Sequence, residues 1–309
     1  MNTSSSSTPS SNSRSRALVL AGAGAAGNAW QVGLTAGLAE AGVDLTAADL
    51  VIGTSAGSTG AAQLTSGIRP AELYAAILSQ VIPPRPPGAP SEPPRGQGPA
   101  KSASYLAWSN QVIADSTDLP DWRRRMAAAA LEKDAVEDTG SARWRATVAA
   151  RFPSAEWPER RVLIAALDAR TAEPVVFDRD SGIDLVDAVA ASTSNGFDGS
   201  YRIGENRYLN GAYRRSSNAD LATGYERVLI LDPFGGRSRT PLEWGMDLAT
   251  QVAELRASGS RVETVFPDAG AGDVFNENAL DPSTRRQAAL GGHQQGRALA
   301  PQLAGFWSA

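Results

Sequence analysis

The sequence predicts an α/β protein in which helices cover both faces of a mostly parallel sheet, a three-layer α/β/α arrangement. Short apolar segments typical of buried strands alternate with helical segments along the chain, as parallel sheets require. The first of these strands leads into a glycine-rich turn, and the second leads into a turn centred on a serine. A chain of 309 residues can form one large α/β domain, and we expect residues 16–309 to do so.

The N-terminal part of the chain divides into a polar tail, two strand–helix units and a proline-rich loop. Residues 1–15 are almost all Ser, Thr, Asn, Pro and Arg, so we expect a disordered tail. We then expect strands at 17–21 and 50–53, a loop at 22–27, and helices at 28–41, 56–66 and 70–81. Proline and glycine dominate residues 82–100, which predicts a flexible surface loop.

The C-terminal part continues the alternation. Residues 102–150 have a helical pattern, with Trp108, Trp122 and Trp144 as expected packing anchors. We expect strands at 162–167, 174–177, 207–209, 228–231 and 262–266, and helices at 185–192 and 282–307. The strand at 207–209 leads into a tight turn at Asn210-Gly211.

Composition excludes several classes of function. The net charge of −4 gives no electrostatic footprint for nucleic acid. The absence of cysteine removes disulfides, thiolate metal sites and a cysteine nucleophile, and we expect a cytoplasmic protein. The single histidine and the lack of paired carboxylates on a helix leave nothing that would ligate a metal. The chain contains no run of eighteen apolar residues, so we expect no membrane span.

The N-terminal apolar segment resembles a secretory signal, because Arg14 and Arg16 precede an apolar stretch that ends in small residues. We favour a buried first strand instead. Cleavage at this segment would remove the glycine-rich turn that follows it.

The serine-centred turn is the most informative feature of the chain. Residues 53–57 read Gly-Thr-Ser-Ala-Gly and lie between a predicted strand and a predicted helix. In this context the serine hydroxyl is exposed, and Gly53 and Gly57 let the strand and the helix pass close together. Glycine and alanine are abundant, so the pattern can arise by chance. The strand before it favours Ser55 as a nucleophile.

The glycine-rich turn has two interpretations. Residues 22–27 read Gly-Ala-Gly-Ala-Ala-Gly, which matches the dinucleotide-binding fingerprint after a first strand. That interpretation needs a carboxylate after the second strand, where the chain has Thr54 and Ser55 instead. We favour the second interpretation, in which backbone N–H groups stabilise an oxyanion beside the serine. The donors would be those of Gly22, Ala23, Gly24 and Ala25.

A third segment completes a resemblance to the patatin-like phospholipase family. Tyr208-Leu-Asn-Gly-Ala212 lies where this family has Asp-Gly-Gly or Asp-Gly-Ala, and Ser217-Asn-Ala-Asp-Leu-Ala222 follows it. The order and spacing of the three elements agree along residues 16–236. The resemblance implies a lipid acyl hydrolase with a Ser–Asp dyad, a lipid or acyl-ester substrate and no cofactor. The motif glycines are Gly27, Gly53, Gly57 and Gly211.

The histidine content supports a dyad independently. His293 is the one histidine of the chain, so a Ser–His–Asp triad would have to use it. It lies in a glycine-flanked C-terminal segment, and we expect a surface or structural role. The ordinary bases that remain for Ser55 are carboxylates and amines.

The chain departs from the family at the dyad aspartate, which is Asn210 here. Asparagine has the shape of aspartate but takes no proton at neutral pH. Asn-Gly is also a favoured turn pair, so Asn210 can serve the turn alone. Two interpretations stay open: an engineered substitution that inactivates the enzyme, or a natural protein without the base. We favour the first, because the flanking residues match the family.

Three further features bear on the site. Ala26 replaces a basic residue that the family usually has, which weakens any claim to an anionic head group at the loop. Ser194-Asn195-Gly196 stands where relatives often have a proline-containing turn. Asp198 and Asp220 are candidate substitute bases, although Asp220 can simply cap a helix.

We therefore predict a serine acyl hydrolase or acyltransferase that cleaves a lipid-like ester through an acyl-enzyme on Ser55. Asn210 is expected to cripple that step. The alternative function is a non-catalytic protein that binds acyl groups or metabolites. A lipid substrate leaves peripheral contact with a membrane open.

Overall fold

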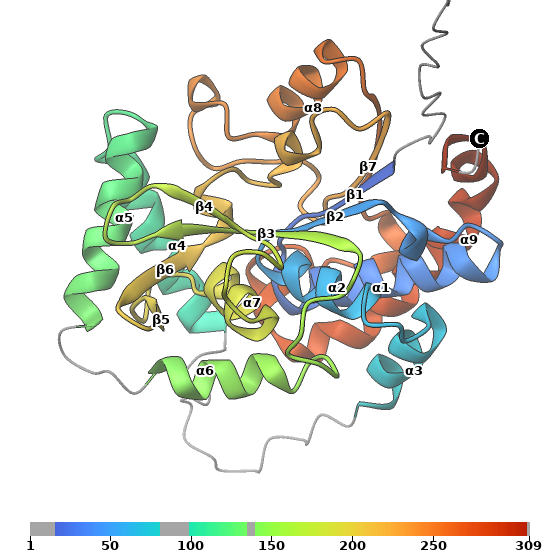
Figure 1. Ribbon diagram of the computed structural model, residues 1–309, viewed down its shortest axis with the longest axis horizontal. Coiled ribbons are helices and arrows are strands. Elements are labelled where there is room, and N and C mark those ends of the chain that lie inside the picture. The colour runs from blue at the N-terminus through green and yellow to red at the C-terminus, as the bar shows by residue number, and fades with distance from the viewer. Residues whose placement is uncertain (1–15, 81–98, 135–139, 308–309) are drawn as a thin grey trace, which may run out of the picture.

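A computed structural model describes residues 16–80, 99–134 and 140–307 of the chain (Figure 1). The predicted tail at 1–15 and most of the predicted loop at 82–100 lie outside the described residues. The last two positions of that loop begin a helix instead.

Eight strands of the described residues form one sheet in the order β5-β6-β3-β2-β1-β7-β8, with β4 also paired to β3. The strands are β1 Arg16–Leu20, β2 Leu50–Gly53, β3 Arg161–Asp168, β4 Pro174–Phe177, β5 Tyr201–Ile203, β6 Asn206–Asn210, β7 Arg227–Leu231 and β8 Arg261–Val265. Neighbouring strands from β3 to β8 along this order are parallel, whereas β4, β5 and β6 pair antiparallel. The sheet is therefore mixed and mostly parallel.

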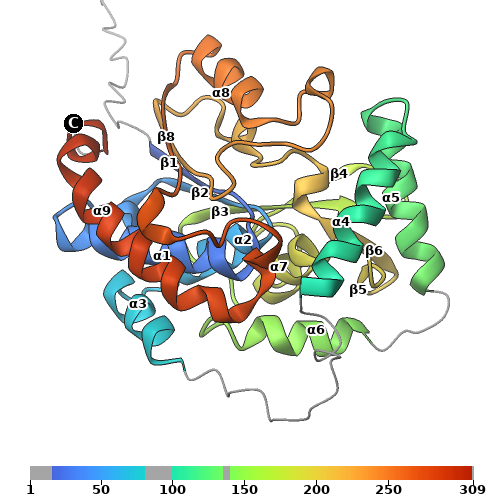
Figure 2. The same ribbon diagram turned by 180° about the vertical axis from the view of Figure 1, so that it is seen from behind.

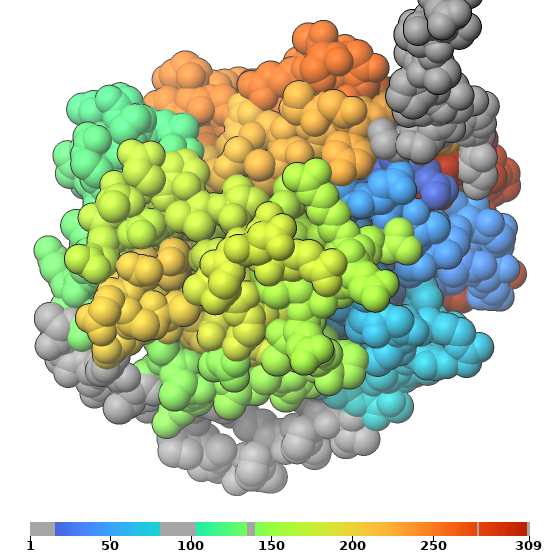
Figure 3. All heavy atoms as spheres, in the orientation of Figure 1, coloured from blue at the N-terminus to red at the C-terminus, as the bar shows by residue number. Residues whose placement is uncertain are grey.

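The helices cover both faces of the sheet (Figure 1). They are α1 Gly24–Glu40, α2 Ala56–Leu64, α3 Pro70–Ser79, α4 Pro99–Ala114, α5 Leu119–Asp134, α6 Gly140–Ala149, α7 Leu185–Thr193, α8 Leu248–Ala257 and α9 Arg285–Trp307. Short 3₁₀ turns connect them: η1 Leu45–Ala47, η2 Gly211–Tyr213, η3 Ala219–Ala222, η4 Leu242–Trp244, η5 Ala269–Ala271, η6 Glu277–Leu280 and η7 Pro282–Thr284. In the space-filling view, β4 and α7 lie in the middle of one face, between α8 and α6 (Figure 3).

Side chains that alternate along each strand point to opposite faces of the sheet, so the core forms separate clusters on the two faces. Leu18 and Leu20 of β1 face the cluster built with α1, α2, α7 and α9, while Ala17 and Val19 face the cluster built with α8. Successive side chains of a strand point to opposite faces, so each strand contributes to both helical layers. Trp122 is buried in a third cluster, where α5 packs at the antiparallel end of the sheet. The three-layer α/β/α prediction is confirmed.

Helices α1 and α9 run side by side in the same direction (Figure 2). Gly33 and Gly37 of α1 face α9, and Gly292 and Gly296 of α9 face α1. A Cβ atom at any of these four positions would overlap backbone atoms of the other helix. The small residues therefore permit the close approach of the two axes.

The predicted strands agree with the structure to within one or two residues. Helix α1 begins at Gly24, so the prediction of a loop through Gly27 was wrong. The predicted helical segment 102–150 contains three helices, and the predicted C-terminal helix begins at Arg285, after the 3₁₀ turn η7. Strand β5 and helix α8 were missed.

Candidate active site

Ser55 occupies a sharp turn between β2 and α2. Its backbone lies at φ 53° and ψ −125°, in a region that residues with a side chain rarely adopt. A Cβ atom on Gly53 would lie 2.5 Å from Cα of Ser58, and one on Gly57 would overlap the carbonyl oxygen of Leu20. The glycines thus let the turn close while the serine is held in a strained conformation.

Two hydroxyl groups hold the backbone of Ser55. The Ser55 N–H donates to Oγ of Ser192 at 2.9 Å, and Oγ of Ser58 donates to the Ser55 carbonyl at 2.5 Å. Ser192 is fully buried near the end of α7. Sequence reasoning missed Ser192, because its role depends on a helix 137 residues away meeting the turn.

Asn210 reaches Ser55 across strand β3. The register pairs Gly53 of β2 with Ile164 and pairs Asn210 of β6 with Ala166. The Asn210 side-chain nitrogen Nδ2 donates to Oγ of Ser55 at 3.0 Å, and its oxygen Oδ1 accepts from the Ala212 N–H at 2.9 Å. The amide is therefore oriented with its nitrogen towards the serine.

The glycine-rich turn lies against the serine. A Cβ atom on Gly22 would lie 2.8 Å from Cβ and 3.4 Å from Oγ of Ser55. No described residue accepts a hydrogen bond from the backbone N–H of Gly22 or Ala23. The first bond of α1 is Gly27 N–H to the Ala23 carbonyl at 2.9 Å, so the N–H groups before Gly27 belong to the open first turn of a helix. A helix N-terminus provides donors and partial positive charge for a developing oxyanion.

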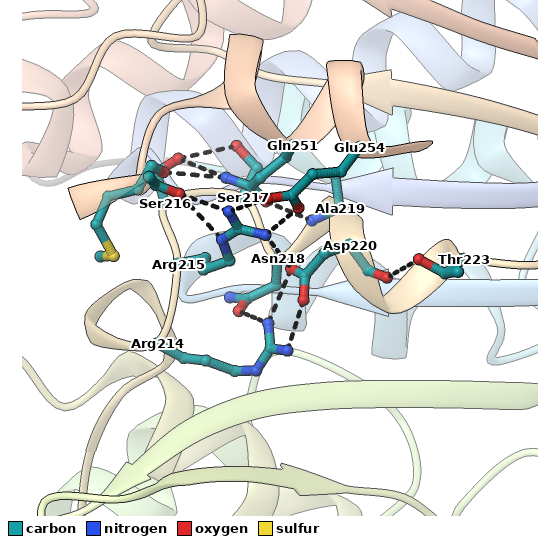
Figure 4. A network of polar contacts seen from close by, with 12 residues as sticks. Arg214, Arg215, Ser216, Ser217, Asn218, Ala219, Asp220, Thr223, Gln251 and Glu254 are labelled. Atoms are coloured by element: carbon teal, nitrogen blue, oxygen red, sulfur yellow. Dashed lines mark hydrogen bonds and ion pairs between the residues drawn. The ribbon is translucent and has the colours of Figure 1, made fainter. Parts of the chain in front are cut away.

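A buried asparagine ties the serine turn to the end of β6. Asn218 Nδ2 donates to Oγ1 of Thr54 at 2.9 Å and to the Gly211 carbonyl at 3.0 Å. Its Oδ1 accepts from Nη1 of Arg214 at 2.8 Å, as Figure 4 shows. Asn218 is fully buried with φ 55°, and it therefore fixes the residues next to both Ser55 and Asn210.

A second layer lies behind this network. Asp232 accepts from Oγ of Ser217 at 2.7 Å and from the Phe234 N–H at 3.0 Å. The Ser217 carbonyl in turn accepts from Oγ1 of Thr54 at 3.2 Å. Burial raises the pKa of the Asp232 carboxyl above its ordinary value, against the lowering effect of these donors.

Comparison with known proteins bears on this arrangement. Residues 18–223 match the family described as patatin-like phospholipase, which covers more than half of the chain. The chain belongs to the patatin-like phospholipase family. This assignment replaces the dinucleotide interpretation of the glycine-rich turn.

Other comparisons are distant. A solved structure of the type III effector protein ExoU is 16% identical to this patatin-like chain, with a TM-score of 0.30. The match covers 92% of this chain and 54% of that one, so this chain spans about half the length of the ExoU chain. No curated protein matches.

The histidine of this patatin-like chain lies away from the serine. His293 stacks on Tyr74 with ring centroids 4.6 Å apart, and its Nε2 lies 2.8 Å from Oε2 of Glu40. Glu40 ends the 17-residue helix α1, which begins two residues after Gly22, the neighbour of Ser55. At about 1.5 Å per residue, the helix separates the two ends by roughly 24 Å. A Ser–His pair is therefore excluded.

The two candidate substitute bases, Asp198 and Asp220, have surroundings that differ from those of Asn210. Asp220 accepts two hydrogen bonds from Arg214, at 2.9 and 2.6 Å, and lies 3.9 Å from Arg215 (Figure 4). The bidentate ion pair occupies both oxygens of the Asp220 carboxylate. Asp198 is exposed in the loop before β5.

Two features are absent from the ranges that the structure describes. Within them, no three His, Cys, Asp or Glu residues cluster in a way that could hold a metal ion. None of the helices in these ranges combines the length and apolar character needed to cross a bilayer.

Proposed function

We propose that this chain carries the acyl-transfer site of a patatin-like serine hydrolase acting on lipid-like esters, with Ser55 as the nucleophile. The observation that carries the proposal is the convergence of three segments on one hydroxyl. Oγ of Ser55 lies 3.0 Å from Nδ2 of Asn210, and Gly22 lies directly against the same serine.

In the proposed reaction, Ser55 Oγ attacks the acyl carbonyl, and the negative charge develops on the carbonyl oxygen. In this proposal the N–H groups of residues 22–25 donate to that oxygen, and each such donor contributes about 10²–10³ in rate. Collapse of the tetrahedral intermediate releases the alcohol and leaves an acyl-enzyme. Water then completes hydrolysis, or a second alcohol completes acyl transfer.

The step that this chain performs poorly is removal of the serine proton. The Asn210 amide donates a hydrogen bond to Ser55 and accepts no proton. An aspartate in the same position would place a carboxylate oxygen within hydrogen-bond distance of the serine. Loss of such a base lowers the rate by about 10²–10⁴.

The test compares hydrolysis of p-nitrophenyl esters by three chains: the parent, Asn210→Asp, and Asn210→Asp with Ser55→Ala. We expect Asn210→Asp to raise kcat/KM by about 10²-fold or more and Ser55→Ala to abolish that gain. Unchanged hydrolysis in Asn210→Asp would refute the proposed dyad.

A second candidate function is a non-catalytic protein that binds acyl groups or metabolites. The hydrogen bond from the Asn210 amide to Ser55 favours it, because this bond engages the nucleophile without activating it. This candidate predicts that a fatty acid binds the parent chain and that Asn210→Asp leaves ester hydrolysis at background.

A further inference from the structure

Two arginines, Arg151 and Arg285, have no carboxylate partner among the described residues, and Arg285 contacts the start of α1 through Asn28. Arg151 follows α6 and lies over the ring of Trp144, 4.9 Å from its centroid. Arg285 is the first residue of α9. Within the described residues, the Arg151 guanidinium has no hydrogen-bond acceptor, and Arg285 donates only to Oδ1 of Asn28, at 3.1 Å. Neither forms an ion pair there.

The surroundings of Arg151 and Arg285 disfavour the positive charge that both side chains carry. Burial and the neighbouring positive charge of Arg285 lower the pKa of Arg151 to about 10, and burial lowers that of Arg285. Arg285 also stands at the N-terminus of the 23-residue helix α9, whose first turn has no acidic residue. The positive end of a helix disfavours a cation and favours an anion. A bound anion would relieve both effects.

A chain of amide contacts connects the two arginines to the candidate active site. Asn28 Nδ2 donates to Oε1 of Gln63 at 2.9 Å, and Gln63 Nε2 donates to the Arg151 carbonyl at 2.9 Å. Asn28 lies about one helical turn beyond Gly24 on α1. Gln63 lies eight residues beyond Ser55 and near the other end of α2, which corresponds to about 12 Å along the helix axis.

We infer that Arg151 and Arg285 form a binding site for a phosphate or phosphodiester group of the ligand whose ester reaches Ser55. Guanidinium groups bind phosphate oxygens with paired, charge-assisted hydrogen bonds. The site supplies positive charge from the segment after α6 and from the start of α9, in a chain that has Ala26 at the family's basic loop position. The link to Ser55 rests on the proposed function, whereas the anion site does not.

The first experiment titrates inorganic phosphate into the full-length chain by calorimetry at constant ionic strength. We compare the parent with Arg151→Gln, Arg285→Gln and the control Arg297→Gln, which removes an exposed arginine of α9 that lies 3.9 Å from Glu40. We expect each of the first two substitutions to weaken binding about tenfold or more, since each removes charge-assisted hydrogen bonds, and the control to match the parent.

Two results would overturn the anion site. One is a parent that binds no phosphate, and the other is equal binding by all four chains. Thermal melting without phosphate provides the check on folding. A purely structural role would lower the melting temperature of Arg151→Gln and Arg285→Gln and leave the phosphate affinity of the folded chains unchanged.

The second experiment identifies the source of the phosphate group. In the Asn210→Asp background, we compare hydrolysis of a short-chain phosphatidylglycerol with that of the matched neutral diacylglycerol. We expect Arg285→Gln to raise KM about tenfold for the phospholipid only. An equal KM change for both lipids would overturn the head-group assignment. Phosphate binding with unchanged KM would assign the site to a free phosphate compound.

The two proposals fail separately. If Asn210→Asp hydrolyses no ester but Arg151→Gln and Arg285→Gln still lose phosphate binding, the proposed dyad is wrong and the anion site stands. If Asn210→Asp is active but no chain binds phosphate, the anion site is wrong and the proposed dyad stands.

Discussion

Ser55 shows how a strained residue is maintained by its neighbours. A non-glycine residue in such a backbone conformation costs about 1–3 kcal/mol. The Ser192 and Ser58 hydroxyl groups offset part of that cost by bonding both backbone polar groups of the serine. In this conformation the side chain of Ser55 contacts both Gly22 and Asn210.

Ser192→Ala tests this support directly. The substitution leaves the Ser55 N–H without its acceptor in a largely buried position, so we expect the free energy of unfolding to fall by about 1–3 kcal/mol. Urea denaturation measures the change. Ser194→Ala is the matched control, because among the described residues the Ser194 hydroxyl makes only a long 3.5 Å contact, with the Gly199 carbonyl. Equal effects of the two substitutions would contradict the assigned role.

Asn218 combines a left-handed backbone with three side-chain hydrogen bonds, and two substitutions separate these contributions. We expect Asn218→Ala to destabilise by about 2–4 kcal/mol, because it leaves buried partners unpaired and keeps the unfavourable φ. Asn218→Gly loses the same bonds but adopts that φ freely, so its loss should be about 1 kcal/mol smaller. Thermal and urea unfolding measure both. A glycine variant less stable than the alanine variant would refute this account.

At the scale of elements, the contact between α1 and α9 positions the glycine-rich turn, since α1 begins within it. Its closeness depends on positions that cannot accept a methyl group without moving backbone atoms. Substitutions in this contact therefore act on the distance between two helices rather than on a single side chain.

Gly37→Ala and Gly305→Ala provide a matched pair of helical substitutions. The first would place Cβ against the His293 carbonyl and backbone of α9, whereas the second points into open space. We expect Gly37→Ala to destabilise by about 1–3 kcal/mol through overpacking. Gly305→Ala should stabilise by about 0.5–1 kcal/mol, because alanine has the higher helix propensity. Chemical denaturation distinguishes these signs, and two stabilising substitutions would show that the helices can separate at no cost.

At the scale of the whole molecule, the buried Asp232 couples stability to pH. Its folded-state pKa is raised above the ordinary value of 3.8, so the folded protein holds this proton more tightly than the unfolded chain does. The corresponding stability is fully present below the unfolded pKa and is lost as pH rises through the folded pKa. Asp232→Asn removes this term. We expect the variant to gain stability relative to the parent as pH rises from about 4 towards neutrality, as measured by urea denaturation at each pH. A difference that is constant with pH would contradict this expectation.

Much of the architecture could be predicted, because the spacing of apolar residues within a short segment distinguishes strands from helices. The buried strands β1, β2 and β7 are nearly continuous apolar runs. The first two motif segments follow β1 and β2, and the third lies at the end of β6. Strand β5 has only three residues, too few for a periodic signal. Helix α8 does have such a signal, since Leu248, Val252 and Leu255 are buried on one face, and it was overlooked.

The site was predictable where the residues belong to one contiguous motif. Ser55, Asn210 and the glycine-rich turn could be named from their local patterns. Ser192 could not, because a serine at the end of a helix has no distinguishing local signal. The arginines at 151 and 285 are 134 positions apart, and their proximity is a property of the packed helices rather than of any sequence pattern.

The parallel packing of α1 and α9 has a consequence for the order of events during synthesis. Chains emerge from the ribosome with the N-terminus first. The helix α1, which presents the glycine-rich turn, is therefore made well before α9, its longest neighbour. A nascent polypeptide would therefore carry the candidate nucleophile well before α9 is available to hold the glycine-rich turn beside it.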